Sequence, residues 1–158
     1  MVSYTVNGLM ENHHRLLLGM NVERFRGSAS ETDGGRTLLD AFHQKHALRI
    51  QTVGADKEYF ASFFLTAITR QRITPHVAPK TTGREPIHQH VLRLNRTVGY
   101  QVSQRAWRKI DELWGKAKCW QGFRRFHRRG LLQVRDEAYL MGWLLNFKRL
   151  VTLLLAPV

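Results

Sequence analysis

The stretch GYQVSQRAWRKIDELWGKAKCWQGFRRFHRRG, from Gly99 to Gly130, is the one around which we expect the fold to be organised. It carries nine Lys and Arg against two carboxylates, and three of the four Trp residues lie in it. From Ser103 to Trp120 apolar residues recur every three or four positions, which predicts a helix with one apolar face. These residues are Ala106, Trp107, Ile110, Leu113, Trp114, Ala117 and Trp120.

The polar face of this predicted helix places an acid among cations. A rotation of about 100° per residue puts Glu112 opposite the apolar face. The cations around it are Arg105, Arg108, Lys109 and Lys116. This face has two interpretations. In the first it is solvated, and Glu112 pairs with Arg108 and Lys116, each four residues away, so that each pair supports the helix by ~0.2–0.5 kcal/mol. In the second Glu112 is a metal-binding carboxylate, and the cations hold a phosphate backbone.

Length and charge limit the class of protein. A chain of 158 residues, 43% of them hydrophobic, is long enough for one domain with a core and is not a disordered tail. Its 25 basic residues against 12 acidic ones give a net charge of +13. A chain with this charge usually binds a polyanion, most often nucleic acid, although a ribosome or a membrane surface as partner would explain the same excess of basic residues.

The remaining bulk features favour a soluble protein of the cytoplasm with no membrane partner. A single cysteine, Cys119, excludes an intramolecular disulfide and a multi-cysteine zinc site. The N-terminus lacks the basic start and apolar run of a signal peptide. The apolar run from Leu150 to Val158 is much shorter than the ~20 residues that a membrane span needs.

Taken in order, the chain predicts alternating strands and helices, and hence an α/β sandwich in one domain. The expected elements are a hairpin of strands 2–9 and 16–22, a loop 27–35, a helix 36–46, a strand 48–55, a helix 58–72, an edge strand 73–78 that contains Pro75, a long loop 79–97, the helix described above and a last helix 136–155. In the last helix, residues at core spacing are Tyr139, Trp143, Leu144, Phe147, Leu150, Val151 and Leu154.

Asp56 is the second candidate for chemistry. It directly follows the apolar run 53–55, and the carboxyl end of a buried strand is where α/β sheets commonly place ligands. It could equally be the N-cap of the segment that starts near Glu58, and both roles can coexist. Together with Glu112 it would suit Mg²⁺, and two such ions catalyse phosphoryl transfer. The histidine pairs lack a third ligand, so we expect no zinc site.

The run Arg124-Arg125-Phe126-His127-Arg128-Arg129 also has two interpretations. It could be a solvated charge run. Its interleaved aromatic and the nearby Trp120 fit a nucleic-acid contact better, with arginines on phosphates and an aromatic for stacking.

Four blocks in order resemble the C-terminal part of bacterial insertion-sequence transposases of the DDE class, whose catalytic domain has a ribonuclease-H-like fold. The blocks are Gly8-Leu9-Met10-Glu11-Asn12, Gly54-Ala55-Asp56-Lys57-Glu58-Tyr59, Ile73-Thr74-Pro75-His76-Val77-Ala78, and the stretch from Gly99 to Gly130. The resemblance implies a mixed sheet flanked by helices over residues 1–158. It also implies that Asp56 and Glu112 are two of three catalytic acids that bind Mg²⁺ or Mn²⁺.

The same resemblance implies that a part of the family's fold is missing. The family's first aspartate lies on a strand upstream of the block that begins at Gly8, and none of the seven residues before that block is acidic. We therefore expect an N-terminally truncated domain without its first strand and first catalytic aspartate. Glu58, Phe60 and Lys116 also depart from the family pattern. Because the absent strand is central, its neighbours would keep unpaired inner edges, and the chain would be marginally stable or oligomeric.

The implied function is DNA transposition by metal-dependent strand transfer, weakened or lost with the first aspartate. The partners would be transposon ends and target DNA in the bacterial nucleoid, with self-association or pairing with full-length transposase. The alternative is a non-catalytic DNA-binding protein that regulates full-length transposase. A small RNA-associated protein would explain none of the four blocks. The expected nucleic-acid contacts are Lys57, Arg105, Arg108, Lys109, Lys116, Lys118, Arg124, Arg125, Arg128 and Arg129.

Overall fold

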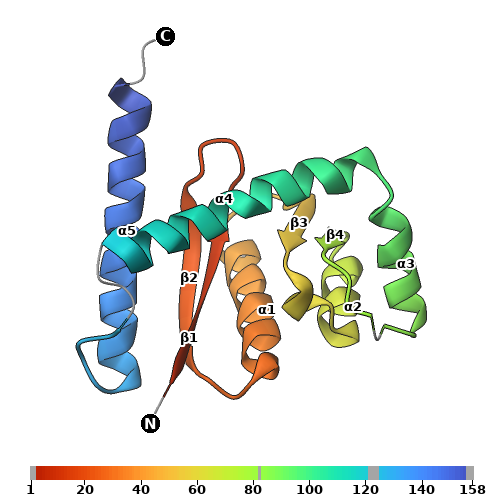
Figure 1. Cartoon of the computed structure of the whole chain (residues 1–158), viewed down its shortest axis with the longest axis horizontal. Helices are drawn as coiled ribbons and strands as arrows, with labels where there is room; N and C mark the ends of the chain where they lie inside the picture. The colour runs from red at the N-terminus through yellow and green to blue at the C-terminus, as the bar shows by residue number, and fades with distance from the viewer. Residues whose placement is uncertain (1–2, 82, 121–124, 156–158) are drawn as a thin grey trace.

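The computed structural model describes residues 3–81, 83–120 and 125–155, and it is a mixed α/β fold (Figure 1). The elements in order are β1 (Tyr4–Met10), β2 (Leu17–Arg24), α1 (Ser28–Lys45), β3 (Thr52–Ala55), the 3₁₀ turn η1 (Lys57–Tyr59), α2 (Ser62–Arg70), β4 (Thr74–Val77), α3 (Pro86–Leu94), α4 (Val98–Trp120) and α5 (Leu131–Leu155). The α/β class is as predicted. A ribonuclease-H-like arrangement stays a prediction.

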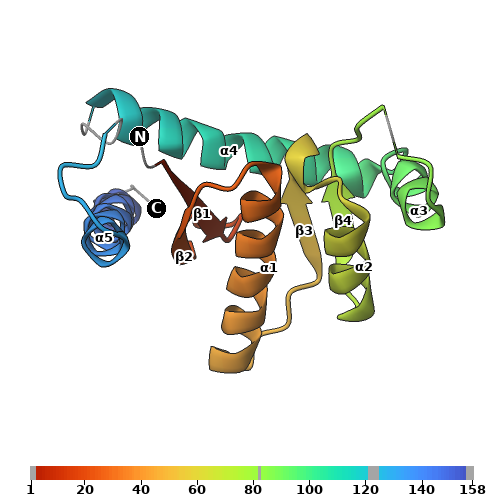
Figure 2. The same cartoon turned by 90° about the horizontal axis from the view of Figure 1, so that it is seen from below.

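In the described part of the chain, four strands form two separate two-stranded sheets. The predicted hairpin is confirmed, since β1 and β2 pair antiparallel with Tyr4 opposite Arg24. The second sheet pairs β3 and β4 in parallel, with Thr52 opposite Thr74. Figure 2 places the strands in a middle layer, with α4 across one face and α1 and α2 on the other. The α5 helix lies beside the hairpin, and α3 lies beyond β4 (Figures 1 and 2).

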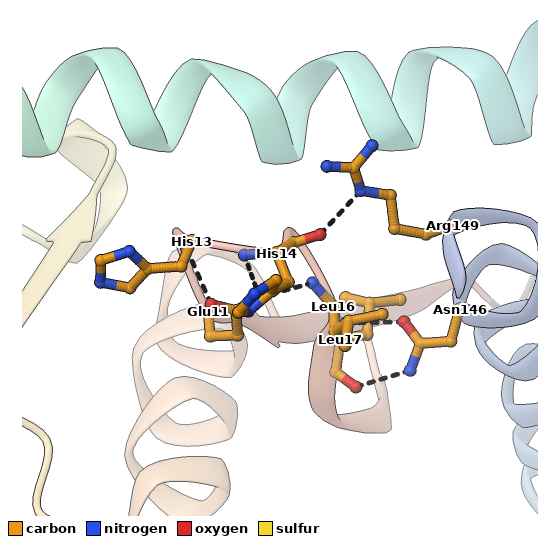
Figure 3. Close-up of polar contacts among 7 residues, drawn as sticks. All are labelled: Glu11, His13, His14, Leu16, Leu17, Asn146 and Arg149. Carbon is orange, nitrogen blue, oxygen red and sulfur yellow. Dashed lines mark hydrogen bonds and ion pairs between the residues drawn. The ribbon is translucent and has the colours of Figure 1, made fainter. Parts of the chain in front are cut away.

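Polar contacts fix the hairpin turn to α5 (Figure 3). The Glu11 carboxylate accepts the backbone N–H groups of His13, His14 and Leu16 at 2.8, 2.7 and 3.1 Å. From α5, the Asn146 amide accepts the N–H of Leu17 and donates to its C=O, both at 2.8 Å. These N–H and C=O groups thus have partners within the protein.

The main core lies between the second sheet and helices α1, α2 and α3. Apolar residues at helical spacing in α2 meet the apolar strands there, and burial of each large side chain contributes ~1.5–3 kcal/mol. The buried members are Leu39, Ala55, Phe60, Phe64, Leu65, Ile68, Ile73, Val77 and Val91. This core makes the second sheet and its three helices one unit.

The first helix begins eight residues earlier than predicted, at Ser28 and not Arg36, so the predicted loop 27–35 is wrong. Glycines disfavour helix interiors, but here they allow close approach from outside the helix. A Cβ at Gly35 would lie 2.6 Å from the ring of Tyr59, and one at Gly34 would collide with the amide of Asn7. The contact with other elements therefore outweighs local propensity.

Other boundaries also differ from the prediction. The predicted loop 79–97 contains α3, which starts with Pro86 in its first turn and buries Val91 against the main core. The predicted strand 48–55 is shorter, and Leu48 is exposed. The predicted helix 58–72 is divided into η1 and α2, and the last helix begins at Leu131. Each of these helix and strand boundaries is decided by tertiary packing, which the hydrophobic periodicity of the sequence does not reveal.

The predicted core face of α5 is wrong. The buried residues of this helix are Val134, Ala138, Gly142 and Leu145. Most of the residues predicted at core spacing are exposed: Tyr139, Trp143, Phe147, Leu150, Val151 and Leu154. The physical reason is that α5 packs on the hairpin along one side and extends beyond the body of the molecule (Figure 1). By length and composition α5 could cross a membrane, a property that it shares with core helices of soluble proteins.

Candidate nucleic-acid interface

The helix α4 lies with its apolar side on the strands and its basic side outward, as its sequence predicts. Ala117 is fully buried, whereas Arg105 and Arg108 are exposed. The close packing depends on Gly54, where an added Cβ would lie 2.8 Å from the Ser103 hydroxyl of α4. Gln104 also donates to the C=O of His76 at 2.7 Å, which anchors α4 on β4.

Glu112 is exposed on this outer side and pairs with a cation of its own helix. The Lys109 ammonium lies 2.7 Å from the Glu112 carboxylate, three residues away, and the two side chains are 38% and 52% exposed. The sequence argument paired Glu112 with Arg108 and Lys116; the Lys116 side chain lies outside what the structure describes, and the ion pair described is the one with Lys109. An exposed pair of this kind contributes only about 0–1 kcal/mol. This contact is what the solvated-face interpretation expects.

The basic segment after α4 continues the cationic surface. Lys118, Arg125, Arg128 and Arg129 are exposed. The segment is held on α5 because the Glu137 carboxylate accepts the backbone N–H groups of His127 at 3.0 Å and Arg128 at 3.3 Å. The backbone is thus anchored while the arginine side chains remain exposed.

Phe126, the aromatic within this segment, packs edge-on against Tyr4, with centroids 6.1 Å apart and planes at 85°. It is partly buried in the packing around β1, and stacking of an aromatic of this segment on a base stays a prediction. Arg124 lies outside the described residues, and so do the side chains of Lys116 and Trp120. Lys57 is exposed but lies on η1, apart in sequence from the other cations.

Asp56 caps the turn that follows β3, as the alternative interpretation of the sequence predicts. Its Oδ1 accepts the N–H of Glu58 at 2.9 Å, and the residue is the N-cap of η1. Burial raises the pKa of Asp56, and the charges of Glu58 and Asp111 raise it further. The hydrogen bonds from the N–H groups of Glu58 and Tyr59 lower this pKa, but the net shift is upward. From α4, the acid that raises the pKa of Asp56 is Asp111, the neighbour of Glu112.

One more acid, Glu31 of α1, interacts by charge with Asp56. Burial raises the pKa of Glu31, and the charges of Asp56 and Glu58 raise it further. Lys80 offsets part of this repulsion, because its ammonium lies 2.8 Å from the Glu58 carboxylate. The sequence argument missed Glu31, since it assigned that residue to a loop. Within residues 3–81, 83–120 and 125–155, no three His, Cys, Asp or Glu residues form a metal-binding group.

The predicted pair of metal ligands therefore remains a prediction. The structure links Asp56 to Glu31, Glu58 and Asp111 by charge, and it places Glu112 beside Lys109. Oxygen ligands of this kind are what Mg²⁺ takes, and one or two carboxylates can suffice when phosphate completes the shell. Carboxylates that repel one another gain most from a divalent cation.

No protein-family model, curated protein or solved structure matches the chain. The resemblance to DDE transposases thus rests on the four sequence blocks.

Proposed function

We propose that the chain binds DNA through a basic surface made of the exposed cations of α4 and of the segment that follows it. The members of this basic surface are Arg105, Arg108, Lys109, Lys118, Arg125, Arg128 and Arg129. The observation that carries the proposal is that α4 turns Arg105, Arg108 and Lys109 outward while its apolar side holds the strands. A chain of net charge +13 with its cations gathered in this way favours a polyanion.

The spacing of the cations on one side of α4 fits a duplex. Arg105, Arg108 and Lys109 lie within four residues, which is about 6 Å along a helix. Duplex DNA carries one charge per ~1.7 Å of its axis, so a segment of that length presents about three or four phosphates. These cations can therefore contact phosphates at once, and we propose positioning on the backbone more than base reading.

The four sequence blocks further support a proposal that this DNA-binding domain derives from a DDE transposase. On that proposal its DNA is a transposon end or a transposition target. The chain then acts either with full-length transposase or on the same DNA ends, and its own strand transfer is weak or absent.

A second candidate function is residual metal-dependent cleavage of DNA. The observation that favours it is the raised pKa of Asp56, whose charged form is disfavoured by burial and by neighbouring carboxylates. A divalent cation held there would relieve that repulsion and could polarise a phosphate. Asp56, together with Asp111 or Glu112 from α4, would hold it.

The test of DNA binding is fluorescence anisotropy with a labelled duplex over a series of salt concentrations. The variant Arg105→Gln/Arg108→Gln should weaken binding and flatten the slope of log K against log salt by about one per lost phosphate contact. The matched control Lys45→Gln/Arg70→Gln removes two exposed charges from the ends of α1 and α2. An equal loss in both variants would mean that net charge alone, and no specific surface, holds DNA.

The test of cleavage is nicking of supercoiled DNA with Mg²⁺ and with Mn²⁺. Nicking by the wild-type chain that is lost in Asp56→Ala and in Glu112→Ala would support the residual catalytic site. Nicking that is lost in Asp111→Ala and retained in Glu112→Ala would mean that Asp111, and not Glu112, is the second acid of the site. Intact DNA binding without nicking would leave the non-catalytic function.

A further inference from the structure

Among the described residues, no strand pairs with the edge of β1 that lies opposite β2, which we call its free edge. The N–H of Phe25 donates to the C=O of Ser3 at 2.9 Å, which makes this pair a hydrogen-bonded one of the antiparallel ladder. Because backbone groups alternate along a strand, residues 5 and 7 also bond to β2. Tyr4, Val6 and Gly8 therefore direct their N–H and C=O groups to the other edge.

The strand β3 likewise has a free edge opposite β4. The N–H of Thr74 donates to the C=O of Gln51 at 2.9 Å, and the N–H of Ala78 donates to the C=O of Ala55 at 3.1 Å. By the same alternation, Thr52 and Gly54 direct their backbone groups away from β4. Over the described ranges, β1 and β3 belong to separate sheets with no ladder between them.

One face of both strands lies against α4, which crosses them (Figure 1). A Cβ at Gly8 would lie 2.7 Å from the ring of Trp114, and one at Gly54 would lie 2.8 Å from the Ser103 hydroxyl and 3.6 Å from the Trp107 Cβ. Ser103 and Trp107 are centred nine residues before Trp114, so these contacts are ~13.5 Å apart along α4, and the strands beneath them are no farther apart than that. One strand between β1 and β3 needs about 9.6 Å, and two need about 14.4 Å.

The opposite face of both sheets is also covered. The Tyr59 hydroxyl, just after β3, donates to the Asn7 side chain of β1 at 3.0 Å. Leu9 of β1 packs against the core cluster that contains Leu39 of α1 and Ala55 of β3. Thus β1 and β3 share a layer between α4 and α1, and an added strand there would be covered on both faces.

We propose that the free edges of β1 and β3 together bind one extended strand of a partner polypeptide and so join the two sheets into one. The partner strand is apolar and β-branched on both faces, because a strand covered by helices on both sides buries alternate side chains equally. Its length is four to seven residues, the lengths of β3 and β1. The inference does not depend on DNA binding.

A second copy of the chain is the less suitable occupant. Each of its described strands already pairs with a neighbour, so a copy offers only two-stranded edges. The spacing along α4 leaves room for one strand and, even at its upper limit of ~13.5 Å, falls short of the ~14.4 Å that two strands need. The occupant is therefore a segment with both edges free, and main-chain hydrogen bonds to β1 and β3 provide the recognition.

The test uses the full chain and a synthetic peptide, Glu-Val-Ile-Val-Thr-Val-Glu, whose glutamates keep it soluble and suit a basic protein. Residue-resolved amide exchange is measured with and without the peptide. We expect exchange at Val6, Gly8, Thr52 and Gly54 to slow by about tenfold or more, while Val53, already bonded to β4, changes little. The same peptide with all of its backbone nitrogens methylated is the control and should have no effect, because it lacks the donors for both edges.

A matched pair of variants tests the edge of β3. Thr52→Pro removes an N–H that faces the proposed strand, at the first residue of β3, where proline is tolerated. It should weaken peptide binding about two- to tenfold relative to Thr52→Ala, which keeps that N–H. Slowed exchange at β1 alone would overturn the proposal, because that result describes simple extension of the hairpin. An equal response to the methylated peptide, or dimer formation in place of binding, would also overturn it.

Discussion

The phenol of Tyr59 donates a 3.0 Å hydrogen bond to the side-chain oxygen of Asn7, and this bond joins two parts of the molecule whose strands do not pair. Asn7 is only 4% exposed. Its amide donates to Asn21 at 2.9 Å, and Asn21 donates to the C=O of Gly34 at 2.7 Å. Burial, with the charges of Asp56 and Glu31, raises the pKa of Tyr59, so the phenol stays a donor.

Replacing this donor should destabilise the fold. In Tyr59→Phe the buried oxygen of Asn7 loses its partner, and we expect the free energy of unfolding to fall by ~1–3 kcal/mol. Chemical denaturation followed by circular dichroism measures this. Tyr139→Phe is the control, since Tyr139 is 45% exposed and its change should be near zero. Equal stability of Tyr59→Phe and wild type would show that the bond adds nothing.

Removing the charge of Asp56 should stabilise the protein at neutral pH. Its folded pKa is raised above the ordinary value of 3.8, so its contribution to stability is present below that pH and is lost as pH rises through the folded pKa. Asp56→Asn keeps a good N-cap without the charge. The variant should unfold at higher denaturant concentration than wild type at pH 7 and at about the same concentration near pH 3. A less stable variant at pH 7 would contradict the raised pKa.

Glu11 should show the opposite pH dependence. Burial alone would raise its pKa, but the N–H groups of Leu16, His13 and His14 outweigh burial and lower it. Its contribution is therefore present above the ordinary pKa of 4.5 and is lost as pH falls through the folded pKa. Glu11→Gln should be less stable than wild type at pH 7, with a difference that shrinks below pH ~4 in denaturation curves. Glu85→Gln, an exposed acid, is the control. A difference that does not depend on pH would point to packing of the turn.

Two neighbouring large residues of α5 should respond differently to truncation. Leu145 is 5% exposed, and Leu145→Ala should cost ~2–5 kcal/mol through the cavity that it leaves. Trp143 is 65% exposed and stacks on Phe147 at 5.4 Å, so Trp143→Ala should cost less than ~1.5 kcal/mol. Thermal and chemical unfolding of both variants measure the contrast. Similar costs would mean that α5 buries its outer face in solution.

Local patterns in the sequence predicted those elements whose hydrophobic period was unambiguous. The hairpin, the helix α4 and the capping role of Asp56 were found in this way, because strand alternation, helical spacing and N-cap chemistry are properties of neighbouring residues. Where two faces of a helix are both apolar, period alone cannot choose between them. In α5 it selected Trp143 and Phe147 for the core, whereas Ala138, Gly142 and Leu145 are the residues that pack on the hairpin.

Among the candidate site residues, the sequence placed Arg105, Arg108 and Glu112 on the outer side of α4, and the structure agrees. It could not find the group of Glu31, Asp56 and Asp111, since these residues come from three elements far apart in the chain. Nor could it pair Glu112 with Lys109 in preference to Arg108, because both partners lie within helical reach.

The sequence by itself determined the α/β class, the strongly basic surface and the polarity of α4, because these follow from composition and from periods within one element. Only the tertiary structure decided which side of α5 is buried, where the glycines of α1 meet Asn7 and Tyr59, and that the strands form two sheets. Those features depend on contacts between distant residues, and the free energy of such contacts outweighs the local preferences that a sequence reveals.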